Sequence, residues 1–140
     1  MTTKEKTNLC RQAVSAANNS HSPYSGFKVG AALLCEDGSL FLGTNIENAS
    51  YSATNCAERV AIQTAVANGK RNFKAMAIAG GKERVGESAC PPCGVCRQVL
   101  SEFCKGDFIL LLAKEKGFEE YTLSQLLPLS FNKDNLRKPR

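Results

Sequence analysis

Apolar and small side chains recur at helical spacing in several stretches of the chain. Lys4 to Asn18 places its apolar positions on one face and predicts an amphipathic helix. Cys56 to Asn68 and Cys93 to Phe103 predict two further helices by the same criterion. A shorter helix is expected over Leu123 to Leu127, because Pro128 cannot continue it.

Other apolar segments are shorter and predict strands. Lys28 to Cys35 and Leu40 to Asn45 flank the turn Glu36-Asp37-Gly38, which is the pattern of a β-hairpin. Lys74 to Ala79 is a short apolar strand, and Phe108 to Ala113 is apolar throughout, as in a strand buried on both faces. The order helix, hairpin, helix, strand, helix, strand predicts an α/β layer architecture with a mixed sheet.

Length, charge and hydropathy predict a single-domain protein that binds neither nucleic acid nor a membrane. The 140 residues fit a single domain over 1–140, with a basic C-terminal tail at about 132–140. Lys and Arg exceed Asp and Glu by 18 to 13, but basic and aromatic residues do not interleave beyond the tail, so no nucleic-acid partner is expected. Residues 1–7 lack an apolar signal segment and no apolar run could span a membrane, which predicts a cytoplasmic protein without a membrane partner.

The seven cysteines divide into scattered and clustered positions. An odd count without a secretion signal argues against a disulfide framework. Cys90, Cys93 and Cys96 are clustered at a spacing that also opens bacterial iron–sulfur motifs. The fourth cysteine of that motif would fall at Leu100, so the iron–sulfur pattern fails.

Two segments that begin predicted helices place thiols where a metal ion could bind. Cys93 and Cys96 are three residues apart and can face one ion across a helical turn. Cys56 would add a third sulfur, and the helix dipoles would favour all three thiolates. Three protein ligands leave the fourth tetrahedral position of zinc for water, which is the catalytic pattern. We therefore expect one Zn²⁺ per chain.

Charged residues beside these cysteines suit hydrolytic chemistry. Glu58 could take a proton from an attacking water and return it to a leaving group. Full helical geometry would turn Glu58 about 200° away from Cys56, so the pair works only if Cys56 occupies the helix cap. Arg59, and with less force Arg97, could donate to a thiolate and offset the negative charge of a three-thiolate site. Taken singly, each of these charged residues would also fit an ordinary solvated surface.

The combination of Cys56-Ala57-Glu58 with Pro92-Cys93 and Cys96 resembles the signature of zinc-dependent nucleoside and nucleobase deaminases. Within that group the chain is similar to the small cytidine deaminases from about Pro23 to Phe131. The segments that match are Pro23 to Leu33, Gly43 to Tyr51, Cys93 to Gln98 and Gln125 to Phe131. The resemblance implies a three-layer α/β/α fold with a mixed central sheet of about five strands.

The resemblance also implies an activity. Zinc held by Cys56, Cys93 and Cys96 would supply the hydroxide that attacks C4 of cytidine or 2′-deoxycytidine, releasing ammonia and the uridine products. Glu58 would move protons between the water, the ring nitrogen and the leaving group. Such an enzyme serves pyrimidine salvage.

Substrate-binding roles follow from the same resemblance. Phe27 would stack near the pyrimidine, and the Ala57 backbone N–H would hold a carbonyl oxygen of the base. Within Asn45-Ile46-Glu47, the polar pair would bind the ribose hydroxyl and so select a nucleoside over a free base. Tyr51 and Phe131 would line the pocket from neighbouring subunits of a homotetramer.

Alternative functions stay open at this point. The same chemistry could act on another aminopyrimidine nucleoside, such as a blasticidin-type antibiotic. A structural-zinc module that binds nucleic acid would need a fourth ligand, with Cys90 or Cys104 as candidates, and would leave Glu58 without a role. Deamination of a polynucleotide lies between these two hypotheses. The extra Cys90 is otherwise expected to be passive.

Overall fold

A five-stranded mixed sheet with strand order β2-β1-β3-β4-β5 forms the centre of the computed structural model, which describes residues 1–137. The strands are β1 (Lys28–Cys35), β2 (Leu40–Thr44), β3 (Phe73–Gly81), β4 (Ile109–Lys114) and β5 (Gly117–Thr122). Only the β3–β4 pair within this sheet is parallel. The expected mixed sheet of about five strands is therefore confirmed.

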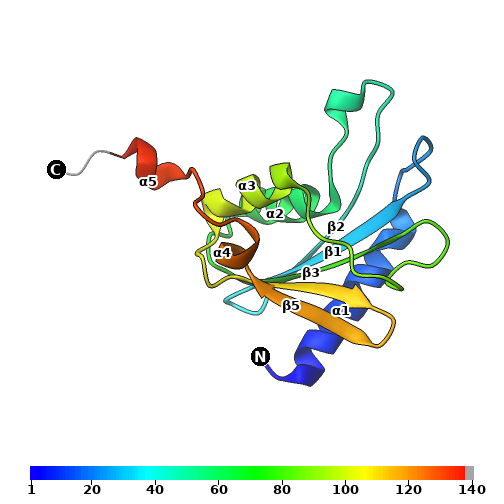
Figure 1. Cartoon of the computed structure of the whole chain (residues 1–140), viewed down its shortest axis with the longest axis horizontal. Helices are drawn as coiled ribbons and strands as arrows, with labels where there is room; N and C mark the ends of the chain where they lie inside the picture. The colour runs from blue at the N-terminus through cyan, green and yellow to red at the C-terminus, as the bar shows by residue number, and fades with distance from the viewer. Residues whose placement is uncertain (138–140) are drawn as a thin grey trace.

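Helices cover both faces of the sheet, so the expected three-layer α/β/α arrangement is also confirmed. Helix α1 lies on one face, whereas α2, α3 and α4 lie on the other (Figure 1). The helices are α1 (Thr3–Ala16), α2 (Ala57–Ala67), α3 (Gly94–Phe103), α4 (Leu123–Leu126) and α5 (Lys133–Leu136), with 3₁₀ turns η1 (Ala17–Asn19) and η2 (Tyr51–Ala53).

Two elements were not expected from the hydrophobic pattern. Strand β5 lies at the sheet edge, and Glu119 and Glu120 interrupt its apolar positions. An edge strand needs only partial burial, so its sequence need not alternate cleanly. The first part of the expected basic tail forms α5, whose first turn is capped by Asn132. The end of that tail, at positions 138–140, lies outside the described residues.

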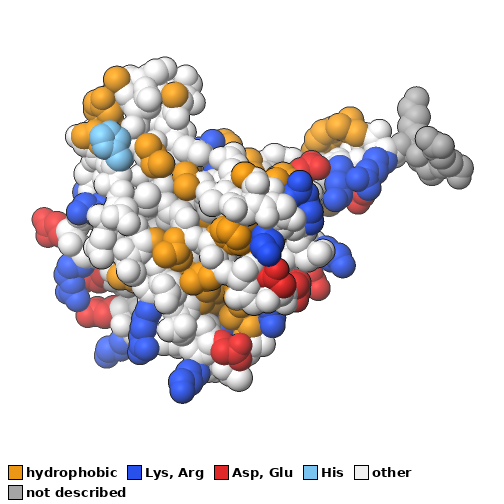
Figure 2. All heavy atoms as spheres, turned by 180° about the vertical axis from the view of Figure 1, so that it is seen from behind, with side chains coloured by type: hydrophobic (Ala, Val, Ile, Leu, Met, Phe, Trp, Pro, Cys, Tyr) orange, Lys and Arg blue, Asp and Glu red, His pale blue; other side chains and the backbone are white. Residues whose placement is uncertain are grey.

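The side chains of the sheet alternate between two cores. Leu33, Met76 and Ile78 pack beneath α2 and α3, whereas Ala75 and Ala77 face α1. Small residues on the second face let α1 approach the sheet closely. Within residues 1–137, no helix combines the length and the apolar character that crossing a membrane requires. Figure 2 shows basic and acidic side chains interspersed over one face of the molecule.

The distance between α2 and the sheet depends on Gly43 of β2. A Cβ atom at this position would overlap the carbonyl oxygen of Ala57 and lie 2.6 Å from the backbone nitrogen of Ala61. Both atoms belong to the helix backbone, which cannot move aside as a flexible side chain could. Gly43 therefore lets the first turns of α2 rest directly on the strand.

Substitution Gly43→Ala should lower the free energy of unfolding by about 2 kcal/mol, since the added methyl group must push α2 away from β2. Urea denaturation followed by circular dichroism measures this change. Gly106→Ala is the matched control, because a Cβ there would meet its nearest neighbour, the Ser124 side chain, at 3.4 Å. Equal unfolding midpoints for the two variants would contradict the close approach at Gly43.

Candidate metal centre and substrate pocket

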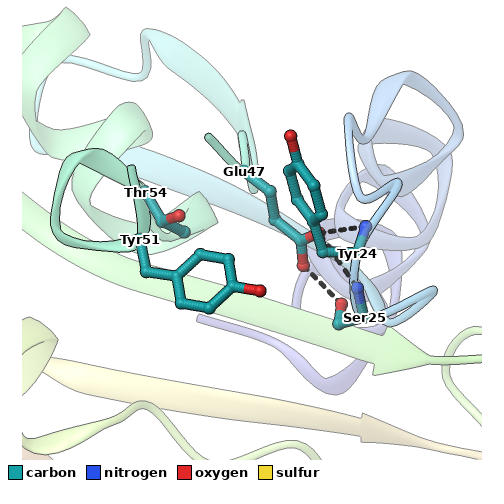
Figure 3. Close-up of a pocket in the computed structure, with 5 residues that line it drawn as sticks. All are labelled: Tyr24, Ser25, Glu47, Tyr51 and Thr54. Carbon is teal, nitrogen blue, oxygen red and sulfur yellow. Dashed lines mark hydrogen bonds between the residues drawn. The ribbon is translucent and has the colours of Figure 1, made fainter. Parts of the chain in front are cut away.

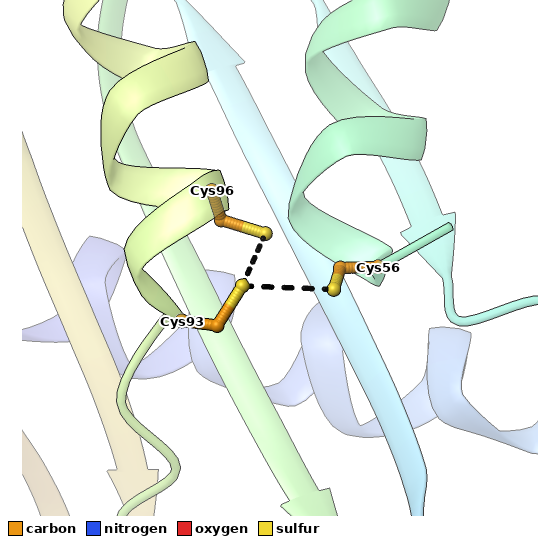
Figure 4. A group of neighbouring side chains, drawn as sticks. All are labelled: Cys56, Cys93 and Cys96. Atoms are coloured by element: carbon orange, nitrogen blue, oxygen red, sulfur yellow. Dashed lines mark hydrogen bonds between the residues drawn. The ribbon is translucent and has the colours of Figure 1, made fainter. Parts of the chain in front are cut away.

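Two cysteines cap the helices that meet at the site. Cys56 is the N-cap of α2, with φ −80° and ψ 153°, and Cys93 is the N-cap of α3, with φ −67° and ψ 165°. Both backbones are extended, which meets the condition that Cys56 sit outside the helix proper. Cys96 lies in the first turn of α3 and points toward the same space (Figure 4).

The three thiols fit a zinc ion. The Sγ atom of Cys93 lies 3.9 Å from that of Cys56 and 3.5 Å from that of Cys96. Three sulfurs placed about 2.3 Å from zinc at tetrahedral angles would be about 3.8 Å apart. All three ligand atoms lie within 4.8 Å of one another, and within residues 1–137 this group contains no fourth Cys, His, Asp or Glu. The donor set is therefore suited to zinc with one position left open.

Hydrogen bonds favour a thiolate at Cys56. The Cys96 thiol and then the Arg59 guanidinium lower the pKa of Cys56 to about 5, against the opposing effect of burial. The same contact with Cys56, followed by burial, raises the pKa of Cys96. Arg59 Nη2 donates to the Cys56 sulfur at 3.2 Å. This contact is the one anticipated from the sequence.

Arg97 has a different contact from the one considered for it. Its Nε donates to the carbonyl oxygen of Pro92 at 2.8 Å, and its Nη1 donates to that of Leu126 at 2.6 Å. The guanidinium therefore fixes the residue that precedes Cys93 and joins α3 to the end of α4. Arg97 supports the cysteine loop through backbone atoms, and among residues 1–137 it makes no hydrogen bond to a thiol.

Glu58 is buried beside the cysteine cluster. It lies in the first turn of α2 and only 5% of its surface is exposed. Burial raises the pKa of its carboxyl group to about 7, and the negative charge of Cys56 acts in the same direction. A carboxyl group with a pKa near neutrality can both accept and release a proton at the pH of the cell.

The remaining cysteines lie apart from the metal cluster. Cys90 packs against Gly80, and the ring of Phe27 lies beside the same glycine. Burial raises the pKa of Cys90 to about 11 and that of Cys104 to about 12, so both thiols stay protonated at neutral pH. Neither joins the cluster, and the structural-zinc alternative therefore lacks the fourth ligand that it needs.

A pocket of about 430 Å³ opens between the loop that precedes β1 and the segment that follows β2 (Figure 3). Its lining residues are Tyr24, Ser25, Glu47, Tyr51 and Thr54. The Glu47 carboxylate accepts hydrogen bonds from the backbone N–H groups of Tyr24 and Ser25 at 2.9 and 3.1 Å, and from the Ser25 hydroxyl. Tyr51 packs edge-on against Tyr24, with ring centroids 5.9 Å apart.

The Asn45 side chain ties together the backbone at the start of β1 and the loop that precedes it. Its Oδ1 accepts from the Val29 backbone N–H at 2.9 Å and from the Ser20 hydroxyl at 2.5 Å. Its Nδ2 donates to the carbonyl oxygen of Phe27 at 2.8 Å. Asn45 thus fixes the backbone that carries Phe27 and keeps one N–H free for another acceptor. Ile46, between the two polar residues, bridges to His21 and Asn55 through its backbone.

The anticipated substrate-binding residues fall into separate places: Glu47 and Tyr51 line this pocket, whereas Phe27 lines a neighbouring hollow with Gly80 and Cys90. Ala57 is buried at the start of α2, and Phe27 lies at the loop beside β1. Phe131 is 62% exposed on the segment after α4, where its carbonyl oxygen accepts from Gln98 at 2.8 Å, and it does not line the pocket of its own chain. Ser25 was missed because the segment Pro23 to Leu33 was matched to the family as a whole, and only Phe27 within it received a role. Its position two residues before Phe27, typical of a serine that bonds a nearby backbone N–H, was the available signal.

Comparison with known proteins gives a consistent result. The profile of the "Cytidine and deoxycytidylate deaminase zinc-binding region" matches residues 3–112. The chain is 47% identical over 129 residues to the cytidine deaminase of Sporosarcina psychrophila, covering 91% of this chain and 92% of that protein. It superposes on the crystal structure of cytidine deaminase from Burkholderia pseudomallei with a TM-score of 0.81 and 38% identity, covering 94% and 100% of the two chains.

A more distant relative has another named substrate. The blasticidin-S deaminase of Bacillus cereus is 30% identical over 110 residues, covering 76% of this chain and 78% of that protein. The two matches to cytidine deaminases are therefore higher in identity and longer in coverage.

Replacing Arg59 with Ala should speed the release of zinc to a chelator about tenfold, because the Cys56 thiolate loses its guanidinium partner and its pKa rises. A metal-sensitive dye follows the release. Arg71→Ala is the control, since Arg71 lies beyond the far end of α2 and donates to the carbonyl oxygens of Val66 and Lys70. Equal release rates for the two variants would show that Arg59 does not stabilise the thiolate.

Proposed function

The chain belongs to the cytidine and deoxycytidylate deaminase family, and from that premise we propose that it hydrolyses cytidine and 2′-deoxycytidine to uridine and 2′-deoxyuridine with release of ammonia. The supporting observation is the buried Glu58 carboxyl group next to a three-thiol cluster that leaves one metal position open. When bound, zinc supplies the Lewis acidity that lowers the pKa of a water molecule.

Three residues of α2 supply proton transfer, binding of the base and charge balance. Glu58 takes up the proton lost by the attacking water and delivers protons to the ring nitrogen and to the departing amino group. The first N–H groups of α2 have no partner within the helix and no side-chain cap at Cys56, so the N–H of Ala57 can bind the carbonyl oxygen of the base. Arg59 donates to Cys56 and balances part of the negative charge around the metal.

Sugar recognition follows from Asn45 and Glu47. Glu47 can only accept hydrogen bonds, and the free N–H of Asn45 can only donate one. A ribose hydroxyl placed between them satisfies both side chains. Because 2′-deoxycytidine is one of the two proposed substrates, this hydroxyl is not the 2′ one, and of the 3′- and 5′-hydroxyls that both substrates carry we assign the 3′-hydroxyl to this pair. Phe27, held by Asn45 through its carbonyl oxygen, supplies a face for stacking the base.

Glu58→Ala should lower kcat for cytidine by about 10³-fold or more, since the proton carrier is removed. Loss of the 4-amino group changes the ultraviolet spectrum and gives a direct assay. Glu102→Ala, which removes an exposed carboxylate from α3, should keep the activity of the unaltered enzyme. No turnover of cytidine by zinc-loaded, unaltered protein would refute this function and redirect the search to other aminopyrimidine nucleosides.

We also propose a homotetramer in which neighbouring chains complete each pocket. Large apolar side chains stand exposed on the loop between η1 and β1, on η2, and on the projecting C-terminal segment (Figures 1 and 2). They are Tyr24, Tyr51, Leu129, Phe131 and Leu136. Tyr24 and Tyr51 lie side by side, and the other three residues follow one another along the C-terminal segment; exposed apolar groups of this kind are typical of interfaces. Phe131 would then reach the pocket of a second copy, whereas Tyr51 lines the pocket of its own chain, contrary to the expectation from the sequence. The reaction would serve pyrimidine salvage in the cytoplasm.

Mixed assemblies test the shared pocket. Light scattering should give the mass of four chains. When Glu58→Ala chains and Phe131→Ala chains, each poorly active alone, are unfolded and reassembled together, activity should exceed the mean of the two separate preparations. A pocket with intact Glu58 then receives an intact Phe131 from its neighbour. Activity equal to that mean, or a monomeric mass, would contradict the proposal.

A further inference from the structure

The hydroxyl group of Ser25 contacts both a residue proposed to bind the sugar and a residue proposed to stack on the base. It donates a hydrogen bond to Oε2 of Glu47. It also accepts one from the backbone N–H of Phe27 at 2.9 Å. One side chain therefore contacts both the carboxylate assigned to the ribose and the residue assigned to base stacking.

The hydrogen-bonding capacity of Glu47 limits where a ligand can bind. A carboxylate offers about four acceptor sites, two on each oxygen. Oε1 already receives the N–H groups of Tyr24 and Ser25, and Oε2 receives the Ser25 hydroxyl. The remaining site is on Oε2, directly beside Ser25. The Ser25 hydroxyl lowers the pKa of Glu47, which keeps the carboxylate ionised and able to accept.

The loop does not need this hydroxyl to form its turn. The backbone N–H of Gly26 donates to the carbonyl oxygen of Ser22 at 2.9 Å, and Gly26 adopts φ +68° as glycine readily does. Asn45 separately holds the carbonyl oxygen of Phe27. Since the turn has its own backbone support, the Ser25 hydroxyl is available for a different task.

We propose that Ser25 is a positioning residue that orients the open acceptor site of Glu47 toward the 3′-hydroxyl of the substrate and fixes Phe27 relative to it. This role rests on the proposed nucleoside deaminase function. It makes sugar selection and base stacking depend on one hydroxyl group, so that a nucleoside fits both contacts at once and a free base fits only one.

A pair of substrates that differ only in the 3′-hydroxyl tests the role: 2′-deoxycytidine and 2′,3′-dideoxycytidine. For each zinc-loaded variant, kcat/KM is measured for both, and the ratio reports how strongly the enzyme uses that hydroxyl. Ser25→Ala should lower the ratio about tenfold, mainly through KM for 2′-deoxycytidine. Ser25→Thr, which keeps a hydroxyl, should preserve most of it. Ser15→Ala, on the exposed side of α1, is the matched control and should leave the ratio unchanged.

A double substitution separates positioning from a general loss of stability. If Ser25 acts through Glu47, adding Ser25→Ala to Glu47→Ala should change the ratio no further. A fall in kcat/KM by the same factor for both substrates, or an equal loss of the ratio in Ser25→Ala and Ser25→Thr, would overturn the role of the hydroxyl. Failure of the unaltered enzyme to deaminate 2′-deoxycytidine would instead refute the proposed function itself.

Discussion

The direct contact between α2 and β2 at Gly43 sets the geometry on which the site depends. With no side chain between them, the carbonyl oxygen of Ala57 and the backbone of the strand are in contact. Two residues beyond Gly43 the same chain segment presents Asn45, and the start of the helix presents Cys56 and Glu58. This close backbone contact, together with the hydrogen bonds of Asn45, helps to fix the residues proposed to bind the sugar relative to the residue proposed to carry protons.

Electrostatics at the metal centre follow from the helix ends. Cys56 and Cys93 both occupy N-caps, where unpaired N–H groups and the helix dipole favour negative charge. Arg59 adds a full positive charge beside the first of these sulfurs. Three thiolates alone would weaken the Lewis acidity of zinc by donating too much charge. The two helix dipoles and the guanidinium oppose that effect. Burial separately raises the pKa of the Glu58 carboxyl group to about 7.

The sequence was most informative where spacing has a direct physical meaning. Cys56 and Glu58, two residues apart, can act together only at a helix cap, and the cap is observed. The spacing of Cys93 and Cys96 likewise required one helical turn. Strand β5 was not anticipated because its glutamates suit a half-exposed edge, where burial imposes little pattern. Arg97 was expected to contact a thiolate but bonds the carbonyl oxygen of Leu126, 29 positions away. Ser25 received no role, although it bonds the carboxylate of Glu47, 22 positions away. Contacts over such separations leave no periodic signal in the sequence.

The saturated Oδ1 of Asn45 has a consequence for the analogues that the pocket can accept. With Val29 and Ser20 occupying that oxygen, the amide can only give a hydrogen, while Glu47 can only receive one. In the proposed binding mode this pair selects a hydroxyl over its isosteres, because a hydroxyl can accept one hydrogen bond and donate another. A fluorine or a ketone at that carbon can accept a hydrogen bond from the amide. It has no hydrogen to donate to the carboxylate, so the Glu47 oxygen is left facing another set of lone pairs. A protonated amine has no lone pair and so cannot accept the hydrogen of the amide. A substituent at this sugar carbon is therefore accepted when it can both receive a hydrogen bond from Asn45 and donate one to Glu47.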